Sequence, residues 1–188
     1  MADPIARSPI APLAPVAVRG GWEVSGRQSS AALTLADCTA LPKLLVRGID
    51  ALPVPFGRAE RDGGALVVGS GPSEWTVLGE HVGPAPDGDF VSVIDVTHGR
   101  ALMRVEGVQA PNLLAKLCAV DFSERVTPDG AAFRSSVAKL VTDVVRDDRD
   151  GTPSYLLHCE RSSGQYLFDA VLDAGAEFGI EPTGGDTA

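Results

Sequence analysis

The sequence predicts an α+β protein in which antiparallel sheets carry helices on one face. Two observations lead to this class. Short β-rich runs separated by glycine and proline turns occur along much of the chain, and two segments of the second half carry apolar residues at helical spacing. With 44% hydrophobic residues the 188-residue chain can build a core, and with 5% aromatic residues it must fill that core mainly with aliphatic side chains.

The first 18 residues are predicted to form an extended, proline-rich N-terminal arm. Pro4, Pro9, Pro12 and Pro15 interrupt them, and each proline fixes φ and removes a backbone donor. Neither a helix nor a central strand is expected there. Such an arm is either mobile or lies along the surface of a partner.

The rest of the first half is predicted to be β-rich. Residues 22–36 indicate one or two strands, and 41–49 indicate a strand or a short helix. The runs ALVV and WTVLG, with glycines and a proline between them, predict a hairpin over 65–79. The Pro/Gly-rich loop at 83–89 predicts a boundary between two halves of one domain.

The second half predicts alternating strands and helices. The expected elements are strands at 90–97 and 101–107 around a turn at 98–100, a helix at 109–118, strands at 135–148 and 154–160, and a helix at 163–178 that ends at Gly179. The order strand, helix, strand, strand, helix is most of a ferredoxin-like split βαβ unit. A single α+β domain is therefore expected over 19–180, with a flexible tail at 181–188.

Charge and composition exclude several classes of partner. The formal net charge of −9 argues against nucleic acid and anionic membranes, which both require a basic surface. No apolar run reaches the roughly 18 residues needed to span a bilayer, and the N-terminus lacks the apolar segment of a secretory signal. A cytoplasmic location is expected. Cys38, Cys118 and Cys159 are widely spaced and flanked by apolar residues, so we expect buried thiols and no disulfide framework.

The histidines are the first candidates for chemistry. His98 lies in the stretch DVTHGR, where Asp95 could orient it for catalysis, but a tight turn or a contact surface is the favoured interpretation. His81 falls in a predicted loop and His158 in a strand, and their spacing matches no metal motif. The aspartate-rich run 143–151 indicates a solvated hairpin tip. The sequence therefore predicts no catalytic, cofactor-binding or metal-binding residues, and no point where polar side chains converge.

The tryptophans and several aliphatic residues are candidates for burial. Trp75 is expected in the core, whereas Trp22 is either core or an anchor for a partner. Six further residues are predicted to be buried: Leu114, Leu117, Val141, Leu157, Leu167 and Val171.

Residues 94–118, IDVTHGRALMRVEGVQAPNLLAKLC, resemble a stretch of folate-binding aminomethyltransferase-like domains. The matching positions are Asp95, Thr97, Gly107, Ala110 and Leu114. Over residues 5–180 the chain resembles the gamma subunit of heterotetrameric sarcosine oxidase. The landmarks of that resemblance are RSPIAPL, LPKLLVRG, GPSEW, DVTHGRALMRVEG, LLAKLCAVDF and FDAVLDAGAEFG.

The resemblance implies a subunit of a larger enzyme. The family complex oxidatively demethylates sarcosine to glycine, produces hydrogen peroxide and, with tetrahydrofolate, yields methylenetetrahydrofolate. FAD, FMN and NAD are then expected on the alpha and beta subunits and zinc on the delta subunit. The gamma chain itself carries no cofactor and packs mainly against alpha, with beta and delta as further partners.

Two other functions stay open at this point. In AKLVTDVVRDD, only Asp143 matches the catalytic aspartate of the folate enzymes, and a lone carboxylate does not suffice for catalysis. A stand-alone folate-binding or aminomethyl-transfer protein would use Asp143 and His98. A subunit of a related N-methyl amino acid dehydrogenase would have the same sequence features as the gamma subunit.

Overall fold

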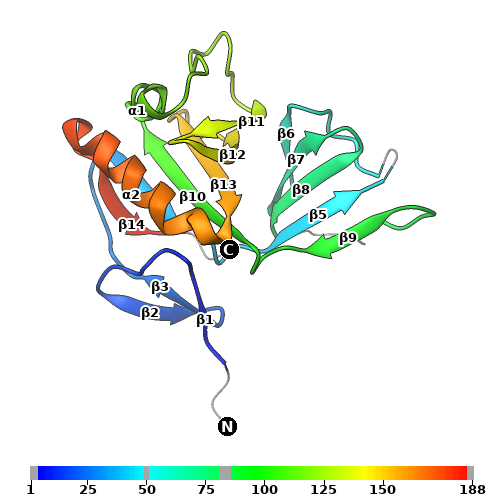
Figure 1. Cartoon of the computed structure of the whole chain (residues 1–188), viewed down its shortest axis with the longest axis horizontal. Helices are drawn as coiled ribbons and strands as arrows, with labels where there is room; N and C mark the ends of the chain where they lie inside the picture. The colour runs from blue at the N-terminus through cyan, green and yellow to red at the C-terminus, as the bar shows by residue number, and fades with distance from the viewer. Residues whose placement is uncertain (1–3, 49–50, 81–85, 186–188) are drawn as a thin grey trace.

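The described residues form three sheets and two α-helices, in an α+β arrangement that confirms the predicted class (Figure 1). The computed structural model describes residues 4–48, 51–80 and 86–185. The predicted boundary at 83–89 lies partly outside these residues. No helix in the described ranges is both long and apolar enough to cross a membrane.

The N-terminal arm forms part of a small three-stranded sheet. Its strands are β1 (Ala6–Arg7), β2 (Val16–Arg19) and β3 (Trp22–Ser25), in the order β1-β3-β2. The sequence predicts an extended arm with neither a helix nor a central strand, and in the structure β1 and β2 are the two edge strands of this sheet. Three of the prolines lie in the loop between these strands and interrupt neither. Gly20 and Gly21 make the β2–β3 turn with φ of 54° and 78°, values that glycine adopts without strain.

A six-stranded sheet forms the centre of the molecule. Its strands are β4 (Leu33–Asp37), β10 (Arg100–Gly107), β11 (Ala132–Val137), β12 (Leu140–Arg146), β13 (Ser154–Glu160) and β14 (Glu181–Gly184), in the order β11-β12-β13-β10-β4-β14. In a ferredoxin-like unit the last strand would pair with the first. Here β4, from the first half of the chain, lies between β10 and β14. The strand β14 also corrects the prediction of a flexible tail for residues 181–184.

Both helices cover one face of this sheet (Figure 1). Helix α1 (Ala110–Leu117) and helix α2 (Gly164–Gly175) confirm the two predicted helices. Pro111 fits the first turn of α1, where its missing N–H has no partner in the helix. Gly179 adopts the left-handed φ of 70° just beyond the short helical turn that follows α2, so it ends this segment as predicted.

The other face of the six-stranded sheet packs against a five-stranded sheet. Its strands are β5 (Lys43–Arg47), β6 (Ala59–Asp62), β7 (Ala65–Gly71), β8 (Glu74–Gly79) and β9 (Ser92–Asp95), in the order β6-β7-β8-β5-β9. The β7–β8 pair confirms the predicted hairpin, and β5 is a strand. Leu66, Val68 and Leu78 of this sheet pack against Leu102 and Leu156 of the central one.

Residues 135–148, predicted as one strand, are instead the two arms of a hairpin. Its turn is at Ala138 and Lys139, whose φ values of 47° and 69° are unusual for residues other than glycine and asparagine. Val141, predicted to be core, is 72% exposed, in the part of β12 that precedes its pairing with β13.

The predicted core residues other than Val141 are at least partly buried. Leu114, Leu157, Leu167 and Val171 are fully buried, and Leu117 is half-buried at the edge of the same core.

The stretch DVTHGR connects two sheets. Strand β9 pairs with β5, whereas β10 pairs with β4 and β13, so residues 96–99 cross from one sheet to the other and the expected hairpin does not form. The imidazole of His98 stacks on the buried Trp22 ring, with centroids 4.8 Å apart and planes at 10°. His98 therefore fixes the small N-terminal sheet against the crossover.

Replacing His98 with alanine is expected to lower the free energy of unfolding by about 0.5–1.5 kcal/mol, because it removes one stacked pair from a partly exposed site. The midpoint of urea unfolding measures this loss. His98→Phe keeps an aromatic ring over Trp22 and should retain most of the stability. A loss as large as that of a fully buried leucine would contradict the proposed contact.

Candidate functional site

Polar side chains line up across four strands of the central sheet, on the face toward the five-stranded sheet. Arg134 of β11 lies opposite Asp143 of β12, which lies opposite His158 of β13. Residues directly opposite each other share a face of the sheet. Arg100 of β10 adds a second cation, and it forms an ion pair with Glu160, which lies opposite it on β13. We call these five residues the Asp143 cluster.

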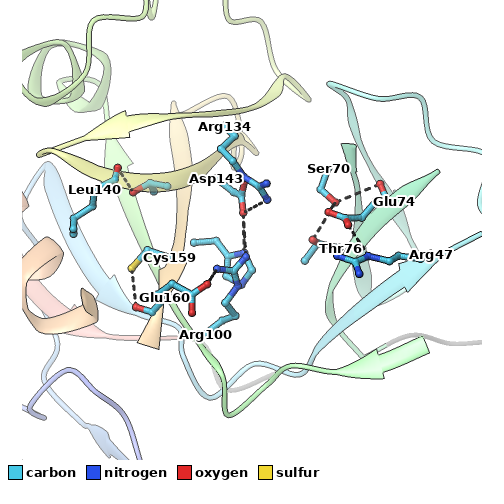
Figure 2. A network of polar contacts seen from close by, with 12 residues as sticks. Arg47, Ser70, Glu74, Thr76, Arg100, Arg134, Leu140, Asp143, Cys159 and Glu160 are labelled. Atoms are coloured by element: carbon cyan, nitrogen blue, oxygen red, sulfur yellow. Dashed lines mark hydrogen bonds and ion pairs between the residues drawn. The ribbon is translucent and has the colours of Figure 1, made fainter. Parts of the chain in front are cut away.

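Asp143 is the centre of this cluster (Figure 2). Arg134 donates to both carboxylate oxygens, from Nε at 2.6 Å and from Nη2 at 3.2 Å. The guanidinium of Arg100 lies 3.7 Å from Oδ2. His158 Nδ1 is 3.6 Å from the same oxygen. This distance is too long for a hydrogen bond, so the contact is electrostatic. Two permanently charged guanidinium groups, those of Arg134 and Arg100, therefore lie beside the Asp143 carboxylate, and Arg100 also pairs with Glu160.

Burial and charge set the protonation states in the cluster. Burial alone would raise the pKa of Asp143, but its interactions with His158 and Arg134 outweigh burial and lower it. Burial lowers the pKa of His158, an effect that Asp143 only partly offsets. At neutral pH an ionised carboxylate thus faces a neutral imidazole. The imidazole is 4% exposed, and its Nε2 is buried without a hydrogen-bond partner.

Little room exists for a substrate next to Asp143. A cavity of about 20 Å³ lies between the two sheets there, and its lining includes Ser70, Gly69, Arg134 and Asp143. This volume holds about one water molecule. Figure 2 shows Arg47, Ser70, Glu74 and Thr76 on the facing five-stranded sheet, where they form their own polar contacts. Of these four residues, only Ser70 lines the cavity. A general base must reach the proton that it removes, and this cavity is too small to hold a substrate beside Asp143.

The other predicted candidates do not join this cluster. The Asp95 carboxylate accepts the Thr97 N–H at 2.8 Å and so holds the crossover turn; hydrogen bonds from Thr97 lower its pKa. His81 lies outside the described residues. Cys38, Cys118 and Cys159 are buried, as predicted. Trp75 is buried, as predicted, and its Nε1 donates to the Val54 carbonyl at 2.7 Å.

Sequence reasoning missed a second cluster on the same face of the sheet. Asp147 is 5% exposed and accepts hydrogen bonds from Arg104 and Arg61, at 2.8 Å and 2.7 Å. The prediction of a solvated tip for residues 143–151 is therefore wrong for Asp147, and the expectation that polar side chains do not converge is wrong as well. The available signal was Arg104, a lone cation inside the apolar strand ALMRVEG. In the described part of the chain, no group of three or more His, Cys, Asp or Glu side chains is arranged to hold a metal ion.

Lys43 is the most deeply buried charged residue of the five-stranded sheet. Its Nζ donates to the carbonyls of Thr39 and Leu41, at 2.6 Å and 2.7 Å. Burial lowers its pKa from 10.5 to about 8, although Asp37 opposes the shift. The Lys43 ammonium is buried in the protein interior, where it cannot reach a substrate. The lowered pKa therefore indicates that the buried charge costs folding stability, and it does not identify Lys43 as a nucleophile.

The pKa of Lys43 predicts a pH dependence of stability. Between pH 8 and 10.5 the unfolded chain holds the lysine proton and the folded chain has lost it, so this residue makes the free energy of unfolding rise with pH. Between pH 7 and pH 11, the free energy of unfolding of the wild-type protein should rise by up to about 3 kcal/mol relative to that of the Lys43→Met variant. Urea unfolding of both proteins across this range measures the difference, since other groups titrate equally in both. A difference that does not change with pH would refute the prediction.

Sequence comparisons find similar proteins among aminomethyltransferases and a dimethylglycine dehydrogenase. An aminomethyltransferase from Geobacillus thermodenitrificans is 35% identical over 107 residues, which cover 57% of this chain and 28% of that protein. Human mitochondrial dimethylglycine dehydrogenase is 25% identical over 174 residues, 88% of this chain and 20% of that protein. The chain thus spans less than a third of the length of these curated relatives.

Solved structures share the fold. A chain of the heterotetrameric sarcosine oxidase from Corynebacterium sp. U-96, in complex with pyrrole 2-carboxylate, superposes with a TM-score of 0.69 at 21% identity, covering 81% of this chain and 89% of that chain. Aminomethyltransferase T of the glycine cleavage system from Bartonella henselae superposes with a TM-score of 0.66 at 13% identity. This match covers 89% of this chain and 55% of that chain.

The family follows from a match over most of the chain. The family model described as the GCVT N-terminal domain matches residues 66–188, which is more than half of the sequence. This match agrees with the aminomethyltransferase relatives and with the shared fold. The chain therefore belongs to the GCVT N-terminal domain family.

Proposed function

We propose that this chain is the gamma subunit of a heterotetrameric sarcosine oxidase, and that its role in the complex is structural. The observation that carries the proposal is the extent of the structural match. In structural superposition the chain covers 89% of one chain of a heterotetrameric sarcosine oxidase, whereas it covers 55% of aminomethyltransferase T.

The Asp143 cluster supports a non-catalytic role. Its carboxylate is held by Arg134, and the neighbouring cavity has room for about one water molecule. Catalytic transfer to a folate would require that carboxylate to be accessible beside a bound pteridine. Under this proposal the cluster instead connects strands β10 to β13 of the central sheet.

The complex supplies the chemistry in this proposal. It demethylates sarcosine oxidatively to glycine, releases hydrogen peroxide and, with tetrahydrofolate, forms methylenetetrahydrofolate. FAD, FMN, NAD and zinc belong to the other subunits, alpha is the main partner of this chain, and beta and delta are further partners. We also propose a cytoplasmic location, in line with the acidic composition and the three widely spaced cysteines.

Co-expression tests the proposal. The chain is produced alone and together with a tagged candidate for the alpha subunit. We expect stoichiometric co-purification with that partner, no sarcosine turnover by the isolated chain, and no heat on calorimetric titration of the isolated chain with tetrahydrofolate. Turnover or folate binding by the isolated chain would favour a stand-alone aminomethyl-transfer protein. Failure to co-purify would overturn the subunit role.

A related N-methyl amino acid dehydrogenase is the second candidate, because the likeness to dimethylglycine dehydrogenase extends over 88% of the chain. The reconstituted complex distinguishes the two. Peroxide formation from sarcosine under air supports the oxidase. Oxidation of dimethylglycine that depends on an artificial electron acceptor, without peroxide, supports the dehydrogenase.

A further inference from the structure

Strand β9 is the last strand of the five-stranded sheet, and its outer edge carries apolar side chains. Among the described residues no strand pairs with this edge, whereas β5 pairs with the other one (Figure 1). Val93 and Ile94 of the strand are 36% and 46% exposed, and Phe90, which precedes the strand, is 99% exposed. We call Phe90 and residues 92–95 the β9 edge.

The main chain of the β9 edge offers hydrogen-bonding groups to a further strand. The Val96 N–H donates to the Lys43 carbonyl at 2.9 Å, so these two residues form a hydrogen-bonded pair. Hydrogen-bonded pairs alternate along an antiparallel ladder, and the next one includes Ile94. The N–H and C=O groups of Val93 and Asp95 therefore point away from β5. An extended polypeptide segment is the shape that pairs with both residues at once.

The opposite edge of the same sheet is protected against such pairing. Strand β6 exposes Glu60, Arg61 and Asp62, and charged side chains on an edge disfavour pairing with another strand. The N–H of Ala59, its first residue, donates to the Gly130 carbonyl at 2.7 Å and so connects this edge to the loop before β11. The centre of β9 is aliphatic, and an exposed apolar edge of this kind is typical of a surface that a partner covers.

Apolar side chains leave the β9 edge on both faces of the sheet. Val93 lies opposite Val46, which is buried in the core around Trp75. A side chain beside Val93 on an added strand would therefore extend this core. Ile94 points to the other face, because successive side chains alternate along a strand. The segment that fits this edge thus carries apolar side chains at consecutive positions.

The charge around the β9 edge restricts the choice of occupant. Asp87 and Asp89 are exposed just before the strand, and the nearest arginine on β5, Arg47, already forms an ion pair with Glu74 at 2.7 Å. The formal net charge of the chain is −9, so a second copy would bring like charges together. A segment of another protein with Lys or Arg beside its apolar residues complements this surface.

We propose that the β9 edge binds an extended segment of the alpha subunit, in which consecutive apolar residues are flanked by basic ones. The segment adds a further strand to the five-stranded sheet. This inference rests on the proposed function, because it concerns the same partner, and it goes further by assigning the surface through which the two chains meet.

The affinity of the full chain for the tagged candidate for the alpha subunit tests this surface. Val93→Pro removes an N–H that points away from β5, and Val93→Lys places a charge on the apolar edge. Both variants leave the hydrogen bonds between β5 and β9 in place. We expect each to raise the Kd about tenfold or more, because the complex loses a main-chain hydrogen bond or an apolar contact. Thermal unfolding of each variant shows whether it is folded.

Two further sets of variants serve as the control and as the test of charge. Val141 is also an exposed valine in a strand, but it belongs to the central sheet, so Val141→Lys should leave the Kd unchanged. The double variant Asp87→Asn with Asp89→Asn should weaken binding several-fold at low salt and lessen its dependence on salt. A Kd that does not change in the double variant would overturn the assignment of a basic segment.

Hydrogen exchange shows whether the main chain of the β9 edge takes part. Peptides over residues 91–95 should exchange more slowly in the complex than in the isolated chain, whereas those over 60–62 should not change. Unchanged exchange at 91–95, or wild-type affinity in both Val93 variants, would overturn this inference and leave the subunit role intact. Absence of binding by the wild-type chain would overturn both. A dimer of the isolated chain that Val93→Lys dissociates would assign the edge to a second copy and contradict the inference.

Discussion

Replacing Asp147 with alanine is expected to lower the free energy of unfolding by about 3–5 kcal/mol, because it leaves the buried Arg104 without its carboxylate. The partner charge stays in a low-dielectric site, and Arg61 loses both of its hydrogen bonds to the same carboxylate. The midpoint and slope of urea unfolding, measured by circular dichroism, give the change.

An exposed ion pair provides the control for this variant. Lys116 and Glu177 form a salt bridge in which both side chains are largely accessible, so Glu177→Ala should cost less than about 1 kcal/mol. An equal, small loss in both variants would mean that Asp147 is hydrated in solution and that the Arg104 ion pair does not organise the sheet.

Replacing Leu157 with alanine is expected to cost about 2–5 kcal/mol, because the side chain is fully buried in the core beneath α1 and α2. Val141→Ala is the matched control. Val141 lies in the neighbouring strand β12 but is 72% exposed, so its truncation should change stability by less than about 0.5 kcal/mol. Comparable losses at the two positions would contradict the register of the β11–β12 hairpin.

The sequence predicted the elements whose signals are local. The apolar stripe of α2, the glycine beyond it and the β-rich runs of β7, β8 and β13 were each readable within a few residues. The β11–β12 hairpin was missed because Ala138 and Lys139 carry none of the usual residues of a tight turn. The crossover at 96–99 was missed because its direction depends on pairing with distant strands.

The polar clusters were harder to predict for the same reason. Asp143 was singled out from the sequence, but the positions of its neighbours depend on the register of β11, β12 and β13. Arg104 and Asp147 are 43 residues apart, and nothing in the sequence pairs them. One residue of slip in either strand would move each side chain to the opposite face of the sheet.

The place of β4 constrains how the polypeptide can reach its native state during synthesis. This early strand has β10 on one side and β14 on the other, so its two edges are satisfied only after residues 100–107 and then 181–184 have left the ribosome. Pairing between strands that are far apart in the sequence is slow, and the edges of β4 stay unpaired until β10 and β14 are available. The nascent chain is therefore expected to need a chaperone or a very late folding step, and expression at reduced temperature should raise its yield.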